Sequence, residues 1–193
     1  MGTLYRQAGS LITPQPGEIW IEIGSDRWEG SSVYFGELAR EKDVKFYSID
    51  HDESASQRIR HSHVQWQISD GLAWCRRVLP TLNCQVGLVY LDNFDYAWDI
   101  NHWDTRLRDQ RKEYQERFGL EMNNQNCQVA HLQQFLAIEP YLTDCAIVIC
   151  DDTYTLNDCW VGKGGGVVLY LLAKGWNLVK AEDFGVILQP CNA

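Results

Sequence analysis

The sequence predicts an α/β domain in which a doubly wound, mostly parallel sheet is covered by helices on both faces. Short, bulky apolar runs alternate along the chain with segments of helical spacing. Acidic residues stand at or just after the ends of most of these runs. The last two apolar runs are close enough to form an antiparallel hairpin. The chain has 193 residues, room for one ordinary domain, so residues 1–193 are assigned to a single domain.

The first half of the chain predicts four strands with helices between them. Residues 1–17 contain Gly and Pro without any period and are expected to form an irregular leader. The expected strands are apolar runs at residues 18–24, 44–49, 64–68 and 86–91. Helices are expected at residues 33–39, from the apolar spacing, at 53–60, from the polar composition, and at 71–79, where Pro80 ends the helix.

The second half contains an insert before the alternation resumes. Residues 98–128 are charged and are expected to be helical, ending in an Asn-rich loop at residues 122–126. On this insert the residues expected to share one face are Trp103, Leu107, Tyr114 and Phe118. The following elements are a helix at 129–141, a strand at 145–150, a helix at 164–174 ended by Gly175, and a hairpin of residues 176–180 and 184–188.

Composition excludes several classes of partner. The chain carries 17 basic and 26 acidic residues, a net charge of −9, which disfavours a surface that follows phosphates, so no nucleic-acid partner is expected. No apolar stretch approaches the ~18 residues of a membrane helix, and the first residues do not resemble a signal peptide. We therefore expect a cytoplasmic protein without a membrane partner. The seven cysteines form no Cys-x-x-Cys pair and are expected to be mostly reduced, packed thiols.

Acidic residues mark the predicted carboxyl ends of the strands. They are Asp50, Asp70, Asp92, Asp151 and Asp152. Parallel sheets bind ligands beyond the carboxyl ends of their strands, so the functional site is expected at this edge.

The first strand ends in a glycine turn, Glu22-Ile-Gly24-Ser25, that leads into a helix. Backbone at such a turn can approach a ligand closely. The dinucleotide fingerprint is absent, because Asp26 stands where the second glycine is required. The acidic Glu22 before the turn suits a cationic or hydroxyl-rich ligand better than a pyrophosphate.

Taken in order, these strand-end motifs resemble those of class I S-adenosylmethionine-dependent methyltransferases over roughly residues 18–189. The resemblance implies the Rossmann-like fold of that family, with a seven-stranded sheet and a reversed last strand. It implies that the Gly24 turn approaches the methionine portion of the cofactor, that Asp50 binds the ribose hydroxyls, and that Ser69 and Asp70 contact adenine. The cofactor-binding residues expected on this basis are Glu22, Gly24, Ser25, Asp50, Ser69, Asp70 and Asp92.

A narrower resemblance concerns the acids after the fourth and fifth strands. Asp92, Asp151 and Asp152 resemble the metal-binding acids of catechol-type and sugar-type O-methyltransferases. The resemblance implies a Mg²⁺ ion that orients an acceptor hydroxyl, and activity that depends on this ion. Asp92 is then the candidate catalytic base, since Asp95 stands where some relatives carry a histidine. The alternative is that Asp152 caps the next segment and Asp151 faces solvent.

Other polar residues have less specific interpretations. Lys163 lies in a Gly-rich segment, residues 162–166, that lacks the phosphate-loop pattern. It is interpreted as a solvated loop lysine, or as a contact for an anionic substrate. His131 is interpreted as an ordinary residue at a helix start, and His102 as a candidate base in a lid. The insert, residues 98–128, is expected to be either a cover over the cofactor or an arm of a homodimer.

The preferred prediction is an S-adenosylmethionine-dependent O-methyltransferase that acts on a small hydroxylated acceptor with help from Mg²⁺. A glycosyltransferase that uses a nucleotide sugar is the second hypothesis, because Asp50-His51-Asp52 could hold a metal and a diphosphate. A binding protein that keeps the fold without turnover is the third.

Overall fold

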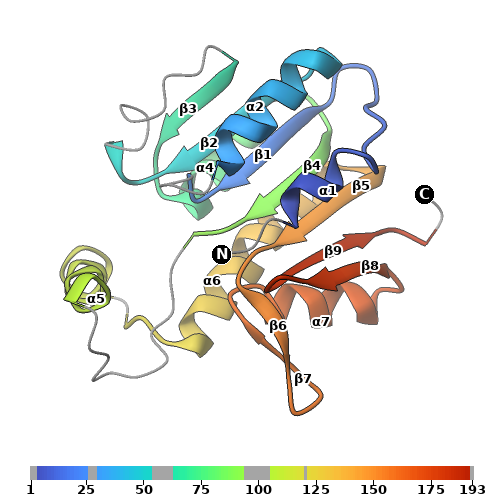
Figure 1. The fold of residues 1–193 in the computed structure, drawn as a ribbon. Helices are drawn as coiled ribbons and strands as arrows, with labels where there is room; N and C mark the ends of the chain where they lie inside the picture. The colour runs from blue at the N-terminus through green and yellow to red at the C-terminus, as the bar shows by residue number, and fades with distance from the viewer. Residues whose placement is uncertain (1–3, 26–29, 54–62, 94–104, 120, 192–193) are drawn as a thin grey trace.

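The computed structural model describes residues 4–25, 30–53, 63–93, 105–119 and 121–191 (Figure 1). Its centre is a seven-stranded sheet with the strand order β3-β2-β1-β4-β5-β9-β8. The strands are β1 (Ile19–Ile23), β2 (Lys45–Asp50), β3 (Val64–Ile68), β4 (Val86–Leu91), β5 (Leu142–Cys150), β8 (Asn177–Glu182) and β9 (Gly185–Gln189). Strands β1 to β5 pair in parallel, whereas β9 runs antiparallel to both β5 and β8. The predicted sheet and its C-terminal hairpin are therefore confirmed.

Helices cover both faces of the sheet, as its doubly wound order requires. One face packs against α4 (Gly71–Arg77), α6 (Asn124–Ile138) and α7 (Gly165–Ala173). The other packs against α1 (Tyr5–Ala8) and α2 (Ser31–Lys42). Two short 3₁₀ helices, η1 (Leu79–Leu82) and η2 (Glu139–Tyr141), follow α4 and α6. Helix α5 (Thr105–Phe118) lies apart from these layers, beyond the arrowheads of β1 and β4 (Figure 1).

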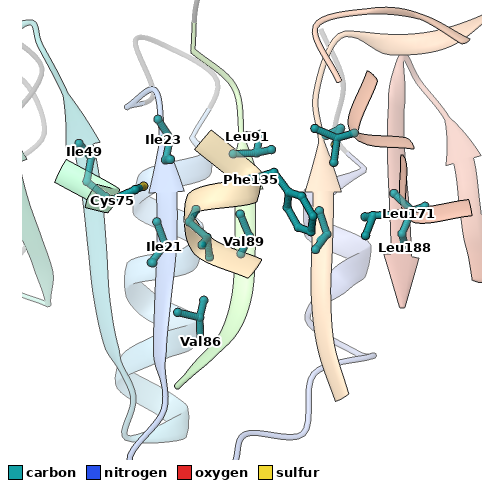
Figure 2. Packing of buried hydrophobic residues seen from close by; sticks show 14 of the residues in the cluster. Ile21, Ile23, Ile49, Cys75, Val86, Val89, Leu91, Phe135, Leu171 and Leu188 are labelled. Atoms are coloured by element: carbon teal, nitrogen blue, oxygen red, sulfur yellow. The ribbon is translucent and has the colours of Figure 1, made fainter. Parts of the chain in front are cut away.

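Strand β1 shows how the sequence divides the core between the two faces. Successive side chains of a strand point to opposite faces, so Ile21 and Ile23 face α6 while Trp20 faces α2. Figure 2 shows these isoleucines in the cluster that includes Phe135 of α6. Because both faces are covered, the strand is buried along its whole length, which explains why its sequence is a nearly continuous apolar run.

Three local differences from the predicted elements have clear causes. The leader is not wholly irregular, because Tyr5–Ala8 form one helical turn whose Tyr5 is buried against the sheet. Helix α6 begins at Asn124 instead of residue 129: the Asn-rich segment caps it, and the Asn123 side chain accepts a hydrogen bond from the amide of Asn126 at 2.8 Å. The α6 helix then ends at Ile138, where η2 takes over.

The third difference is a hairpin that the sequence does not predict, β6 (Thr153–Leu156) and β7 (Cys159–Gly162), between β5 and α7. Its turn is Asn157-Asp158, and both residues have positive φ, as a type I′ turn requires. The predicted helix at 53–60 falls almost entirely outside the described residues, as do Trp103 and His102. Within the described ranges, no helix is long and apolar enough to cross a membrane.

Candidate functional site

The carboxyl ends of the five strands β1 to β5 lie side by side at one edge of the sheet. Backbone hydrogen bonds continue past the strand ends: the amide of Gly24 donates to Ile49 at 2.9 Å, and the amide of Asp92 donates to Ile23 at 2.8 Å. The amides of Ser69 and Asp151 make equivalent bonds to the neighbouring strand ends, at 2.9 and 3.0 Å. The acids that end these strands are therefore brought to the same edge, as predicted.

The glycine turn packs directly on the loop after β4. Gly24 has a φ of +91°, and a Cβ at this position would lie 2.4 Å from the backbone nitrogen of Asn93. Real side chains do not fit such a distance, so only glycine allows the two loops to touch. Residue 24 therefore fixes the place of Asp92 and Asn93 relative to the turn.

Glu22 supports the turn from below. Its side chain is fully buried, and its carboxylate accepts hydrogen bonds from the hydroxyls of Ser31, at 2.6 Å, and of Ser32 and Ser48. These serines come from the start of α2 and from β2, so Glu22 ties the helix entry to the sheet. The hydroxyl of Ser25, in the turn itself, lies 2.7 Å from that of Ser48. Glu22 and Ser25, two of the predicted cofactor residues, thus belong to the framework that holds the turn.

Asp50 organises the loop that follows β2. Its carboxylate accepts hydrogen bonds from the amide of Ser25 at 2.9 Å and from the amide of Asp52 at 2.8 Å, and the His51 ring nitrogen lies 3.4 Å from it. An ionised carboxylate has about four acceptor positions, so Asp50 can bind a hydroxyl in addition to these amides. The bond to the Asp52 amide closes a turn over Asp50-His51-Asp52.

The loop after β3 ends in the cap of α4. Asp70 is the N-cap residue, and its carboxylate accepts a hydrogen bond from the amide of Ala73 at 2.8 Å. The Ser69 hydroxyl donates to the carbonyl of Asp70 at 3.1 Å. Both residues nevertheless line a cavity together with Asp50, which brings three of the predicted cofactor residues to one place.

This cavity has a volume of about 110 Å³ and lies over the ends of β2, β3 and β4. Its lining residues are Ile49, Asp50, His51, Ser69, Asp70, Gly71, Leu72, Asn93, Tyr114, Ala130, Gln133 and Gln134. The side-chain oxygens of Asn93 and Gln134 are buried, and in the described structure neither has a hydrogen-bond partner. Buried acceptors without partners cost free energy unless a ligand supplies a donor. A ligand or a water molecule that carries N–H or O–H groups could donate to these two oxygens.

Sequence reasoning misses the wall of this cavity that α6 supplies. Gln133 and Gln134 lie in the middle of a helix, and nothing in their local sequence marks them as ligand contacts. Asn93 is also missed, but it follows Asp92 directly, and its place at a strand end could have marked it as a candidate ligand contact. The interpretation of His131 as a helix-start residue is wrong, because it lies buried inside α6 and its ring contacts the Asn93 carbonyl.

Helix α5 of the insert reaches the same cavity through Tyr114. This side chain is 5% exposed and packs on a small cluster with Met122 and Cys127 that is separate from the two main core clusters. Its ring also meets the His51 ring edge to face, with the centroids 5.6 Å apart. One residue of the predicted apolar face of the insert therefore covers the cavity, whereas the side chains of Leu107 and Phe118 lie outside the described part of the chain.

The acids after β4 and β5 surround a lysine. The Lys163 ammonium lies 2.8 Å from Asp92 Oδ1 and 2.9 Å from Asp152 Oδ2, and its side chain is 3% exposed. Lys163 is thus not a solvated loop lysine. Asp151 is also buried and accepts a hydrogen bond from the Tyr90 hydroxyl at 2.9 Å, so it does not face solvent.

Burial dominates the electrostatics of this cluster. It raises the pKa of Asp92 well above the ordinary value, and the neighbouring Asp151 raises it further, while Lys163 opposes both effects. Burial is likewise the main cause that raises the pKa of Asp151, with Asp152 adding to it. The lysine therefore provides the positive charge that three adjacent acids require.

The predicted Mg²⁺ site does not fit this arrangement. In the parts of the chain that the structure describes, no group of three or more His, Cys, Asp or Glu side chains is placed to hold a metal ion. A divalent ion between Asp92 and Asp152 would have to share their oxygens with the ammonium of Lys163. Asp95, which stands where some relatives carry a histidine, lies outside the described residues.

Comparison with known proteins gives a match at the level of structure. The sequence matches no protein-family model and no curated protein. The structure of CalS11, a calicheamicin methyltransferase, is similar with a TM-score of 0.53 and 15% identity, over 96% of this chain and 75% of that one. An apo structure of CalS11, there called a TDP-rhamnose 3′-O-methyltransferase, gives a TM-score of 0.53 and 14% identity, over 96% and 77%.

The methyltransferase PaMTH1 of Podospora anserina, bound to S-adenosylhomocysteine, is less similar, with a TM-score of 0.49 and 14% identity over 97% of this chain and 75% of that one. The likeness to CalS11 extends over nearly the whole chain, which includes the seven-stranded sheet with its reversed β9. The chain therefore has the Rossmann-like fold of the class I S-adenosylmethionine-dependent methyltransferases.

Proposed function

We propose that this protein is an S-adenosylmethionine-dependent methyltransferase that transfers the methyl group to an oxygen of a small hydroxylated acceptor. The observation that carries the proposal is the cavity over β2, β3 and β4. The Asp50 carboxylate lines it, together with Asn93 and Gln134, whose buried side-chain oxygens have no hydrogen-bond partner among the described residues. The likeness of the fold to a sugar O-methyltransferase supports the choice of acceptor class.

The cavity residues match the polar groups of an adenosyl ligand. Asp50 keeps an acceptor position for a hydroxyl such as a ribose presents. The carboxamide of Gln134 can present either its oxygen or its nitrogen, so it can accept from an exocyclic amino group or donate to a ring nitrogen. Tyr114 supplies an aromatic ring that excludes water from a flat base.

When bound, S-adenosylmethionine would supply an activated methyl group: the acceptor oxygen would form a bond to the methyl carbon as the bond from that carbon to the sulfonium breaks, with S-adenosylhomocysteine as the leaving group. The chain then has to align the acceptor oxygen with the methyl group, exclude water from the site and take up the acceptor's proton. Asp92, at the end of β4 and next to the glycine turn, takes the acceptor's proton in this proposal. No step is assigned to a divalent ion.

The two other hypotheses make different demands. A glycosyltransferase would need Asp50 and Asp52 to hold an ion together, whereas Asp50 binds the Asp52 amide. A binding protein without turnover would bind the cofactor in the same cavity, so it differs only in the absence of transfer to any acceptor.

Ligand-induced thermal stabilisation tests the proposal. S-adenosylhomocysteine at a hundred times its dissociation constant should stabilise the wild type by about 2.7 kcal/mol, which raises the Tm by roughly 5–10 °C. Asp50→Asn should lose most of this shift. Asp144→Asn is the matched control, because Asp144 is an exposed acid near the opposite end of β5, and it should keep the full shift.

A shift with a nucleotide sugar, and none with S-adenosylmethionine or S-adenosylhomocysteine, would refute the proposal and favour the glycosyltransferase. Equal Tm shifts for the wild type and Asp50→Asn would show that the cofactor does not bind at Asp50.

A further inference from the structure

The least expected feature of the molecule is a lysine held inside its acidic cluster. The Lys163 ammonium contacts one carboxylate oxygen of Asp92, one of Asp152 and the backbone carbonyl of Asp92, at 2.8, 2.9 and 3.3 Å. The lysine side chain is 3% exposed, that of Asp92 14% and that of Asp152 44%. The cluster therefore opens outward on the side of Asp152, with the lysine at its buried end.

The backbone around Lys163 is fixed on both sides by glycines that nothing larger can replace. Gly162 has a φ of +85°, and a Cβ there would collide with the carbonyl oxygen of Asp152. A Cβ on Gly164 would lie 2.3 Å from the Cβ of Cys150. These close approaches bring residue 163 against the end of β5.

Hydrogen bonds hold the lysine's backbone in the same place. The Lys163 amide donates to the Asp152 carbonyl at 3.0 Å, and the Gly164 amide donates to the Thr153 hydroxyl at 2.8 Å. The β6–β7 hairpin lies between these two points of the chain and closes the loop that carries the lysine. The position of the ammonium is therefore built by the fold and does not depend on a flexible side chain in solvent.

An ammonium and a divalent ion compete for this position. Both need the same carboxylate oxygens, and two cations a few ångströms apart repel each other strongly in a buried site. A lysine has no lone pair to give while it is protonated, so it cannot join the ligands of the ion.

We propose that Lys163 is a resident cation that takes the place of a divalent metal, neutralising Asp92 and Asp152 and holding them in position, so that the site works without a metal. This inference rests on the proposed methyl transfer for its meaning. Lys163 is a positioning residue here, because it acts through the two carboxylates.

Manganese binding tests this directly and needs no acceptor. Mn²⁺ titrated into chelator-treated protein is followed by the loss of the free-ion signal in electron paramagnetic resonance. The wild type should bind no Mn²⁺ below millimolar concentration, whereas Lys163→Ala should gain one site that binds at least tenfold more tightly. Adding Asp152→Asn to that variant should remove the new site. Lys174→Ala, which removes an exposed lysine paired with Glu139, should behave as the wild type.

A tight Mn²⁺ site in the wild type that Asp151→Asn or Asp152→Asn abolishes would overturn the inference. A folded Lys163→Ala that gains no site would overturn it too. If Lys163→Ala does not fold, the wild-type titration still decides, and Lys163→Arg, which keeps the charge, should fold and exclude Mn²⁺. Stabilisation by S-adenosylhomocysteine in excess chelator is measured alongside: its absence would refute the proposed function, whatever the manganese result.

Discussion

Replacing Gly24 by alanine tests how the glycine turn builds the site. The backbone nitrogen and Cα of Asn93 and the carbonyl carbon of Asp92 would lie 2.4, 2.6 and 2.6 Å from the new Cβ. Ordinary contacts begin at 3.4 Å, so the loop after β4 must move by about 1 Å. We expect this shift to displace Asp92 and Asn93 and to weaken binding of the cofactor.

The size of the effect follows from two separate costs. A side chain at a φ of +91° costs roughly 1–2 kcal/mol in backbone strain, and overpacking against rigid backbone adds about 1–3 kcal/mol. The variant should therefore lose roughly 2–5 kcal/mol in its free energy of unfolding, or about 4–20 °C in Tm for a domain of this size. Gly175 has a φ of +85°, and a Cβ at that position would meet nothing within 4 Å, so Gly175→Ala isolates the strain alone.

Urea denaturation gives the free energies of unfolding, and calorimetric titration with S-adenosylhomocysteine gives the affinities. Gly175→Ala should lose only the strain, and its affinity for the cofactor should equal that of the wild type. Equal stability and equal affinity of Gly24→Ala and Gly175→Ala would refute the idea that contact between the two loops shapes the site.

Three further predictions concern single side chains. Ellman's reagent at pH 8 should label the exposed Cys159 and Cys191 in the native protein but leave Cys75 unreacted, because burial raises the pKa of Cys75 to about 12 and removes its thiolate; labelling of Cys75 without denaturant would contradict this. Tyr114→Ala should weaken S-adenosylhomocysteine binding roughly 5- to 100-fold in calorimetry, as stacking on a base is lost, while Tyr114→Phe keeps most of it; unchanged affinity in the alanine variant would remove α5 from the site. Glu22→Gln should lower the free energy of unfolding by about 1–3 kcal/mol, since one acceptor oxygen then serves three serine hydroxyls, and an unchanged urea midpoint would argue against that role.

The sheet is predictable because its strands are buried on both faces. Bulky apolar runs with acids at their ends define β2, β4 and β5, a similar run that ends in Gly24 defines β1, and the short hairpin at the C-terminus defines β8 and β9. The same reasoning places Asp50 and Asp92 at one edge, since parallel strands align their carboxyl ends. These are local properties of the sequence, and the fold adds only the order of the strands.

The parts that could not be predicted depend on tertiary contacts. Gln134 reaches the cavity because α6 packs on the sheet beside α4, which brings this side chain next to Gly71, and its own neighbours in sequence do not reveal that. The sequence suggests a solvated Lys163 because it does not predict the β6–β7 hairpin that precedes this lysine. That hairpin depends on a two-residue turn at positive φ. The Asn-rich composition around Asn123 suggests a loop. Asparagine is also a common N-cap residue, and Asn123 has that role at the start of α6.

The central claim is that the cavity over β2, β3 and β4 receives the adenosyl part of the cofactor. A crystal structure of the protein with S-adenosylhomocysteine tests it most directly. We predict density in this cavity, with the ribose hydroxyls within hydrogen-bond distance of Asp50 and the adenine beside Gln134 and Tyr114. Adenosyl density outside the cavity, or an empty cavity at saturating ligand, would contradict the account.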